Sequence, residues 1–394
     1  MKKFLKSIAV MSLSLLLFNI CIQPMSAKAA DDELSEAAVA APSAILVERT
    51  SGTVLYEKNA HEKLKPASVT KIMSMLLIME AIEDGSLTVE DKVTASEHAA
   101  SMGGSQIYLE PGEQMTVHDM LKSIAVSSAN DACVAMAEHV AGSEESFVAR
   151  MNERAAELGM KDTTFKNCTG LDADGHVTSA YDISLMSREL LSHDQIKQYT
   201  TIWMDTIRDG AFGLSNTNKL VKFYNGSTGL KTGFTSEAGY CVSASAMRDG
   251  MELIAVIMKA ETSPKRNSDA SALLNYGFAN YTVLTPGEDD AFEPIPVKLG
   301  KIKTANGELE GCEGVLVRKA QVSKLEKNVQ IAEELKAPVE KGQKIGTYTV
   351  TLDGKTIAEI PIVASEQIEK LSTGDIYKTL LGSMFMRSNE GIEQ

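Results

Sequence analysis

"PASVTKIMSMLLIME", residues 66–80, combines a long apolar run with two polar side chains at its start. From Ile72 onward nearly every residue is apolar, which predicts a helix that is covered on all sides. Ser68 and Lys71 are three residues apart, so both side chains project from the same side of this helix. Pro66 suits a helix start, where free backbone N–H groups favour developing negative charge.

The serine and lysine have a chemical interpretation and a structural one. A serine hydroxyl is a weak nucleophile until a base removes its proton. A lysine among apolar side chains has its ammonium form disfavoured by desolvation, so its neutral amine can serve as that base. The structural alternative is a lysine that extends out of a buried helix past a capping serine. The segment contains no histidine, and its only carboxylate is the distal Glu80.

Two further segments favour the chemical interpretation. "SSAND", residues 127–131, puts Ser128 and Asn130 at a predicted helix junction, where such residues are most often caps. "KTG", residues 231–233, begins a predicted strand. The patterns SxxK, SxN and KTG follow one another in the order shared, with Asp in the middle motif, by β-lactamases and penicillin-binding proteins. Together they predict an enzyme with a nucleophilic serine.

The bulk properties and the first residues bound the class of protein. At 394 residues the chain exceeds what one core usually serves, and its formal net charge of −14 excludes a basic nucleic-acid-binding surface. Residues 1–29 combine a basic start, an apolar run and a small-residue "AKA" site, which predicts a secretory signal peptide. A retained membrane anchor is the alternative. We therefore expect an exported protein of the cell wall or the outer face of the cytoplasmic membrane.

The pattern of elements predicts an α/β (α+β) fold in two domains. β-rich segments lie near both ends of residues 30–285, and amphipathic helices lie between them. One antiparallel sheet built from both ends, with the helical block packed on it, satisfies that order. After a proline-rich and acidic linker we expect a small β-rich domain at 293–367. Residues 370–390 could form an amphipathic helix in a membrane interface, or a helix docked on its own domain or a frayed end.

Cysteine and histidine spacing predicts no metal site and no cofactor. The four cysteines beyond the signal peptide have no CxxC spacing, and we expect mostly free, buried thiols. The six histidines form no HExxH pattern, which argues against a metallopeptidase. We expect His176 near the rim of the site.

The chain resembles the D-alanyl-D-alanine carboxypeptidases, a family of low-molecular-mass penicillin-binding proteins. Besides the three motifs, the resemblance rests on "APSAILVERTSGTVLYEKN", "KNCTGLDADGHVTSAYD", "LSNTNKLV" and "GLKTGFTSEAGYCVSASA". It covers residues 35–285 closely and the C-terminal part more loosely. It implies a β-lactamase-like catalytic domain, with the C-terminal β-domain holding the site off the membrane. The implied substrate is a peptidoglycan stem peptide that ends in D-Ala-D-Ala, and β-lactam antibiotics are the implied inhibitors.

The resemblance also implies a role for each motif residue. Ser68 would attack the carbonyl between the two D-alanines, Lys71 would take its proton, and Ser128 would relay a proton to the departing D-alanine. The binding groups would be Asn130 for the substrate amide, Lys231 and Thr232 for the terminal carboxylate, Gly233 for clearance of the substrate backbone, and the backbone N–H groups of Ser68 and Phe234 for the oxyanion. Arg208 would be an extra carboxylate contact.

Three competing functions share some of these features. A class A β-lactamase needs a glutamate base for deacylation, and residues 160–170, "MKDTTFKNCTG", contain none. We therefore expect penicillin to inhibit this protein. A transpeptidase would use the same acyl-enzyme with an amine acceptor. A non-catalytic cell-wall or β-lactam sensor could acylate without turnover, and only an assay with a D-Ala-D-Ala peptide separates it from an enzyme.

Overall fold

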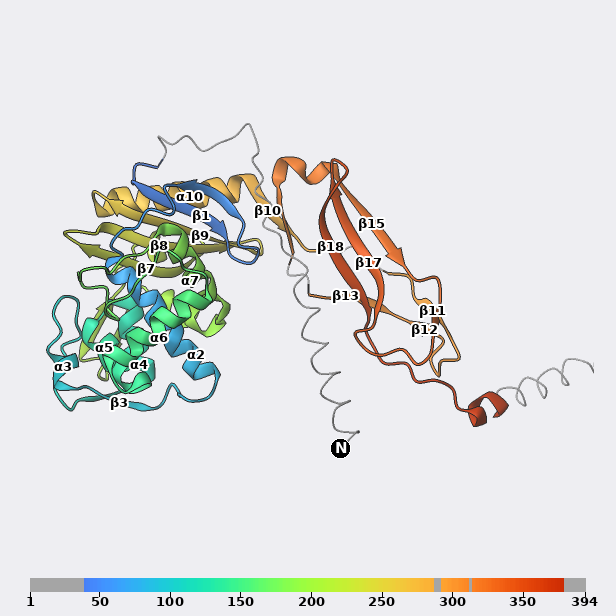
Figure 1. Cartoon of the computed structure of the whole chain (residues 1–394), viewed down its shortest axis with the longest axis horizontal. Coiled ribbons are helices and arrows are strands. Elements are labelled where there is room, and N and C mark those ends of the chain that lie inside the picture. The colour runs from blue at the N-terminus through green and yellow to red at the C-terminus, as the bar shows by residue number, and fades with distance from the viewer. Residues whose placement is uncertain (1–38, 287–291, 312–313, 379–394) are drawn as a thin grey trace, which may run out of the picture. The chain divides into compact units, whose positions relative to one another are not determined.

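The computed structural model describes residues 39–286, 292–311 and 314–378. These residues form two compact units that divide between Ala279 and Asn280 (Figure 1). The predicted signal peptide, 1–29, lies outside the described residues, and so does the part of the predicted 370–390 helix beyond residue 378. Among the described residues, every helix is too short or too polar to cross a membrane.

A five-stranded antiparallel sheet organises the first unit, as the sequence predicted. Its strand order is β2-β1-β9-β8-β7, so the first and last parts of the unit meet in one sheet. The members are β1 (Ser43–Glu48), β2 (Val54–Lys58), β7 (Ser227–Thr235), β8 (Gly239–Arg248) and β9 (Met251–Ala260).

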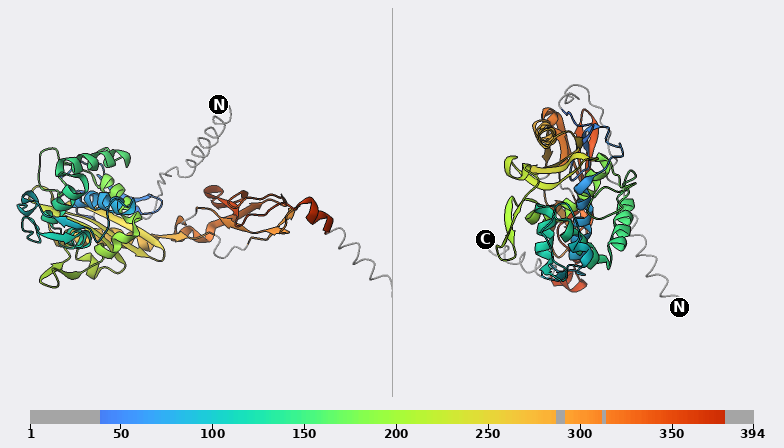
Figure 2. Two further views of the ribbon diagram at one scale, coloured as in Figure 1. Left: turned by 90° about the horizontal axis from the view of Figure 1, so that it is seen from below. Right: turned by 90° about the vertical axis from the view of Figure 1, so that its left-hand side faces the viewer.

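Helices cover both faces of this sheet (Figures 1 and 2). One face carries α10 (Ser263–Asn280), where Gly277 leaves room for Leu253 and Leu46. The central strand β9 is therefore buried almost throughout, which explains its continuous apolar sequence in place of alternation. The other face carries the helical block: η2 (Ala67–Thr70), α2 (Lys71–Glu83), α3 (Glu97–Ala100), α4 (Val117–Val126), α5 (Asn130–Ala141), α6 (Glu144–Glu157), α7 (Ala180–Ser192), η3 (Asp194–Ile196), α8 (Lys197–Thr200) and α9 (Leu220–Phe223). Two small hairpins complete the unit: β3 (Lys92–Thr94) with β4 (Gln114–Thr116), and β5 (Met204–Ile207) with β6 (Phe212–Ser215).

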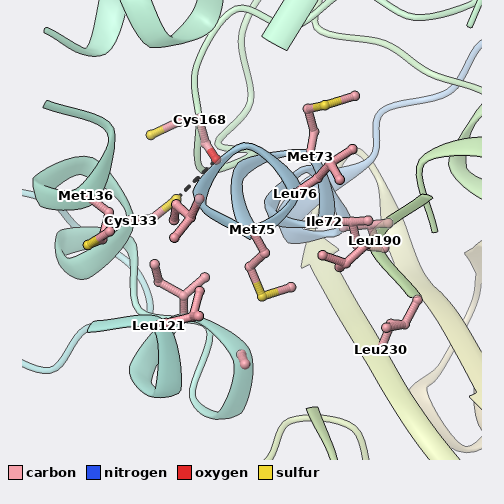
Figure 3. Packing of buried hydrophobic residues seen from close by; sticks show 14 of the residues in the cluster. Ile72, Met73, Met75, Leu76, Leu121, Cys133, Met136, Cys168, Leu190 and Leu230 are labelled. Atoms are coloured by element: carbon pink, nitrogen blue, oxygen red, sulfur yellow. Dashed lines mark hydrogen bonds between the residues drawn. The ribbon is translucent and has the colours of Figure 1, made fainter. Parts of the chain in front are cut away.

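Helix α2 runs through the middle of the core. Ile72, Met73, Met75 and Leu76 are all fully buried, on different sides of the helix. Figure 3 shows them among side chains from α4, α5, α7 and β7. A helix that is apolar all round is stable only inside such a core, which agrees with the sequence prediction.

The free thiols lie in the same region. Cys133, Cys168 and Cys241 are buried and unpaired by disulfides, as predicted, whereas Cys312 lies outside the described residues. The Cys133 thiol donates a hydrogen bond to the carbonyl oxygen of Cys168 at 3.3 Å (Figure 3).

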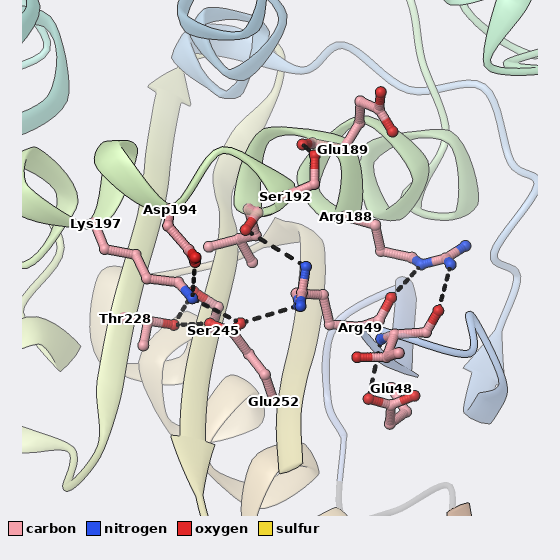
Figure 4. Close-up of polar contacts among 12 residues, drawn as sticks. Glu48, Arg49, Arg188, Glu189, Ser192, Asp194, Lys197, Thr228, Ser245 and Glu252 are labelled. Atoms are coloured by element: carbon pink, nitrogen blue, oxygen red, sulfur yellow. Dashed lines mark hydrogen bonds and ion pairs between the residues drawn. The ribbon is translucent and has the colours of Figure 1, made fainter. Parts of the chain in front are cut away.

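A buried carboxylate fixes the start of β7. Glu252 of β9 accepts a hydrogen bond from the Thr228 hydroxyl at 2.7 Å (Figure 4). Its other oxygen lies 3.2 Å from Arg49 Nε and 3.3 Å from Lys197 Nζ, so two cations balance the buried charge. The strand that carries the KTG motif is thereby tied to the centre of the sheet.

The second unit is β-rich, with its own core around Val339, Tyr348 and Ile362. Its larger sheet has the order β13-β18-β17-β15, with β13 (Gly307–Leu309), β15 (Leu325–Ile331), β17 (Lys344–Leu352) and β18 (Lys355–Ala364). Smaller sheets contain β10 (Tyr281–Leu284) with β14 (Val315–Arg318), and β12 (Thr304–Ala305), β11 (Ile295–Lys298) and β16 (Leu335–Lys336); the short helix η4 (Lys319–Lys324) follows β14.

Candidate active site

Ser68 lies in the 3₁₀ turn η2, immediately before α2 begins at Lys71. The α-helix therefore starts later than the sequence suggested, and Ser68 lies in the 3₁₀ turn that precedes it. Lys71 Nζ lies 3.0 Å from Ser68 Oγ, which is hydrogen-bonding distance. The lysine does not extend out to solvent, because its side chain is fully buried.

Two further acceptors surround the Lys71 amine. Asn130 Oδ1 lies 2.6 Å and the carbonyl oxygen of Thr169 lies 2.7 Å from Nζ. Despite these partners, burial lowers the pKa of Lys71 to about 8. Desolvation penalises the ammonium form, so about one Lys71 side chain in ten is a neutral amine beside the serine hydroxyl at pH 7.

The junction between α4 and α5 supplies the second motif. Asn130 is the first residue of α5, and its side chain does not cap the helix. Its Oδ1 faces Lys71, its Nδ2 donates to the carbonyl of Gly103 at 2.7 Å, and its backbone N–H donates to Ser105 at 2.7 Å. Asn130 therefore connects the lysine to the loop at 103–105.

Ser128 stands at the same junction in a strained conformation. Its backbone φ is +64°, in the left-handed region that non-glycine residues rarely adopt. Its Oγ is buried, and within the described part of the chain no group hydrogen-bonds to it. A buried hydroxyl without a partner is costly, so this oxygen is available to a group that enters the site.

The third motif lies on β7, at the edge of the sheet. Lys231 is buried and donates a hydrogen bond from Nζ to the carbonyl of Thr232 at 2.9 Å. Burial, together with the positive charge of Lys71, lowers the pKa of Lys231 well below its ordinary value. The Thr232 hydroxyl donates to Thr217 Oγ1 at 2.8 Å. An anion that arrived here would stabilise the lysine as an ammonium.

Gly233 lets β7 approach the serine turn closely. A Cβ on this residue would lie 2.8 Å from the carbonyl oxygen of Pro66 and 2.9 Å from the backbone nitrogen of Ser68. In the structure this glycine makes room for the turn that carries Ser68, and its clearance for the substrate backbone stays a prediction. The next residue, Phe234, is 53% exposed, and its ring centroid lies 4.3 Å from that of Tyr240.

The hydrogen-bond partners of Arg208 are not among the predicted site residues. Its Nε donates to Glu113 at 2.7 Å, and its Nη1 donates to the carbonyl of Ile107 at 2.8 Å. The guanidinium thus ties the β5–β6 hairpin to the loop before β4. These contacts give no support to the prediction that Arg208 binds a substrate carboxylate.

His176 is buried beneath the serine turn and not at the rim, which corrects the sequence expectation. The backbone N–H of Lys166 donates to its Nδ1 at 3.1 Å, so the ring proton sits on Nε2, 2.9 Å from Thr70 Oγ1. Burial lowers the pKa of His176 to about 4, which keeps the ring neutral.

Sequence reasoning missed the loop at 166–171 as a supplier of a site group. Asn167 Oδ1 accepts hydrogen bonds from the backbone N–H groups of Thr169 and Gly170, at 3.2 and 2.7 Å, and so shapes this loop. A Cβ on Gly170, whose φ is +86°, would lie 1.9 Å from the carbonyl oxygen of Ala67. The site group that this loop supplies is the Thr169 carbonyl, which contacts Lys71 Nζ. Every residue has a backbone carbonyl, so the amino-acid sequence alone does not reveal this role. Only the asparagine and glycine that form the turn could have pointed to it.

A serine hydroxyl beside a buried amine of lowered pKa, with a cationic strand edge close to the serine turn, defines a serine acyl-transfer enzyme. The family described as D-alanyl-D-alanine carboxypeptidase matches residues 28–262, and the C-terminal domain of penicillin-binding protein 5 matches residues 282–370. The chain belongs to the D-alanyl-D-alanine carboxypeptidase family of hydrolases.

Individual relatives agree with this assignment. D-alanyl-D-alanine carboxypeptidase DacF of Bacillus subtilis is 46% identical over 88% of this chain and 91% of its own length. Penicillin-binding protein 5 from Haemophilus influenzae is 29% identical, with a TM-score of 0.68 over 84% of this chain and 98% of its own. Penicillin-binding protein D2 from Listeria monocytogenes, solved in its ampicillin-bound form, is 32% identical, with a TM-score of 0.57 over 63% of this chain and 100% of its own. The fold class predicted from the sequence is confirmed.

Proposed function

We propose that this chain removes the terminal D-alanine from peptidoglycan stem peptides through an acyl-enzyme on Ser68. The observation that carries the proposal is the 3.0 Å contact between Ser68 Oγ and the buried Lys71 amine, whose pKa is about 8. The family and the names of its members supply the substrate class.

In the acylation step, neutral Lys71 takes the proton of the Ser68 hydroxyl as the oxygen attacks the carbonyl carbon between the two D-alanines. The carbonyl oxygen gains negative charge in the tetrahedral intermediate. The backbone N–H groups of Ser68 and Phe234 are the proposed donors to this oxyanion. The close approach that Gly233 permits between β7 and the serine turn supports this pairing.

The bond to the terminal D-alanine then breaks, and its nitrogen leaves with a proton. We assign Ser128 the role of passing that proton from Lys71 to the leaving nitrogen. The Ser128 hydroxyl is buried and has no hydrogen bond within the described residues. Asn130 holds the substrate amide while it keeps its contact with Lys71. Water then attacks the ester on Ser68 and releases the shortened peptide.

The terminal carboxylate binds at Lys231 and Thr232. Burial lowers the pKa of Lys231, and the negative charge of an arriving carboxylate opposes this effect by favouring the ammonium form. β7 is an edge strand, so a peptide can add to it as a further strand. Arg208 is left out of the proposed binding groups because its guanidinium is already paired with Glu113.

β-Lactams inhibit the enzyme in this proposal by acylating Ser68 and leaving slowly. The loop that follows α6 presents the Thr169 carbonyl, and not a carboxylate, to Lys71. Rapid hydrolysis in class A β-lactamases uses a glutamate base, which residues 160–170 lack. The ampicillin-bound Listeria relative supports this part of the proposal.

The cellular setting is also proposed. Peptidoglycan lies outside the cytoplasmic membrane, so the enzyme must be exported, and residues 1–29 have the composition of a signal peptide. The tail at 370–390 would hold the enzyme at the membrane surface. Fractionation of cells that produce the chain with and without residues 372–394 tests this, because this truncation keeps Ile368 in the core of the second unit and only the full chain should pellet with membranes.

The test of the activity uses the chain from residue 30 to 394. The protein is exposed briefly to benzylpenicillin and analysed by mass spectrometry, while D-alanine release from an N-acetylated L-Lys-D-Ala-D-Ala peptide is assayed in parallel. We expect an adduct on Ser68 and release of D-alanine, both absent in Ser68→Ala. An adduct without release indicates a sensor or a strict transpeptidase, and the absence of both contradicts the proposal.

A further inference from the structure

Tyr108 holds an exposed aromatic ring on a strained backbone. Its side chain is 69% exposed, whereas its neighbours Ile107 and Leu109 are buried. Its φ is +57°, in the left-handed region, which is a genuine outlier for a bulky residue. Such conformations persist only where the surroundings impose them, and they concentrate at functional sites.

Asp131 and Arg208 impose this conformation from both sides. The carboxylate of Asp131, which is fully buried, accepts the backbone N–H groups of Ile107 and Leu109 at 3.1 and 3.0 Å. Arg208 donates to the carbonyl oxygens of Ile107 and Tyr108 at 2.8 and 3.3 Å. The backbone around Tyr108 is therefore fixed, and its ring is presented outward from a rigid support.

The same loop forms one side of the active site. Gly103 and Ser105 accept hydrogen bonds from the side chain and the backbone of Asn130. Asp131, which holds the loop at Tyr108, directly follows Asn130 in the chain. The backbone on either side of Tyr108 is thus anchored to the residue that follows Asn130, on the loop that contacts the proposed substrate-amide group.

A second aromatic ring supports the first. Phe212 of β6 lies edge-on to Tyr108, with ring centroids 6.2 Å apart. The Arg208 guanidinium lies 5.5 Å from the Phe212 centroid, and its charge is balanced by Glu113. The carboxylate of Glu110, two residues after Tyr108, is exposed. An aromatic face suits an aliphatic side chain that ends in a cation, and the exposed carboxylate of Glu110 adds a negative charge to the same loop.

We propose that Tyr108, backed by Phe212, is a specificity residue that contacts the amino-acid side chain preceding D-Ala-D-Ala in the stem peptide. The side chain it favours is aliphatic with a terminal ammonium. This inference rests on the proposed function, because the site assigned to the substrate amide at Asn130 sets where the preceding residue emerges.

The experiment compares kcat/KM for two donors, Nα-acetyl-L-Lys-D-Ala-D-Ala and Nα-acetyl-L-Ala-D-Ala-D-Ala, which differ only in the side chain that precedes D-Ala-D-Ala. Tyr108→Asn removes the ring but tolerates the left-handed backbone. Tyr108→Phe keeps the ring, and Tyr377→Asn removes a comparably exposed tyrosine from the second unit. Acylation by 6-aminopenicillanic acid, which has no acyl side chain, reports on the catalytic groups.

We expect Tyr108→Asn to lower the ratio of the two kcat/KM values by about fivefold, with Tyr108→Phe and Tyr377→Asn close to wild type. An unchanged ratio in Tyr108→Asn overturns the inference while D-alanine release by the wild type sustains the proposed function. A wild-type protein that released no D-alanine would overturn the proposed function, and this inference with it.

Discussion

At the scale of the residue, two opposing effects determine the pKa of Lys71. Three acceptors, Ser68 Oγ, Asn130 Oδ1 and the Thr169 carbonyl, match the three donors of an ammonium group. Complete burial removes the hydration of that charge, and desolvation wins, because the pKa of Lys71 falls to about 8. The residue therefore changes protonation close to physiological pH.

This pKa predicts how acylation depends on pH. About one lysine in ten is neutral at pH 7 if the pKa is 8, so the acylation rate with benzylpenicillin should rise about tenfold toward pH 9 and then level off. Rapid-quench mass spectrometry between pH 6 and 10 measures it. Lys71→Arg keeps a permanent charge and should lose acylation at every pH, while its circular dichroism stays that of the wild type. A wild-type rate independent of pH would show that Lys71 is not the base.

His176 predicts a pH dependence of stability. The folded chain holds its pKa at about 4 against 6.5 ordinarily, so between these values the unfolded chain binds more protons. The free energy of unfolding should therefore be highest above pH 6.5 and fall by roughly 3 kcal/mol as the pH drops to 4. Urea unfolding of the wild type and of His176→Asn at pH 7, 5 and 4 tests this. The variant should lose less stability on acidification, and equal losses would contradict the role of His176.

Some residues of the site could be predicted from the sequence, and others could not. Ser68, Lys71, Asn130, Lys231 and Thr232 carry their chemistry in side chains at recognisable spacing, so motif order was enough to nominate them. The Thr169 carbonyl and the strained backbones of Ser128 and Tyr108 depend on local conformation that long-range packing imposes. The carboxylate contact predicted for Arg208 stays a prediction, and in the structure its guanidinium is paired with Glu113.

At the scale of the element, the contact between β7 and η2 is the critical one. The two segments are far apart in sequence, and the missing side chain of Gly233 leaves room for them to approach closely. The strand patterns at both ends of the unit were enough to predict that these strands share one antiparallel sheet. The sequence patterns did not show that position 233 faces the serine turn, because the face of the sheet to which each residue of β7 points depends on the register of β7 against β8.

Gly233→Ala should therefore impair catalysis strongly. The added Cβ would meet Pro66 and Ser68 backbone atoms, so the strand or the turn must shift at a cost of about 1–3 kcal/mol. We expect acylation by benzylpenicillin to slow at least tenfold and the melting temperature to fall. Gly213→Ala on β6 is the matched control, since a Cβ there meets nothing within 4 Å. Equal acylation rates in the two variants would show that the close approach does not set the oxyanion site.

At the scale of the whole molecule, the candidate catalytic residues all lie in the first unit, and the second unit contributes none of them. Every candidate site residue, from Ser68 to Phe234, belongs to the unit that ends at Ala279. Beyond it, β10 pairs with β14, so Tyr281 already belongs to the second unit. The sequence predicted a β-rich segment there from alternation and glycine turns, but alternation gives no strand order, which depends on pairings such as β13 with β18.

This division predicts that the first unit functions without the second. A chain of residues 31–280 keeps the complete sheet, helix α10 and all three motifs, so it should fold cooperatively. Its acylation by benzylpenicillin should stay within about twofold of the full chain, because no candidate catalytic group is lost. Mass spectrometry of both chains over a time course measures the rates, circular dichroism confirms folding, and Ser68→Ala in the short chain is the control. A folded short chain that fails to acylate would show that the second unit shapes the site, and the division of labour argued here would be wrong.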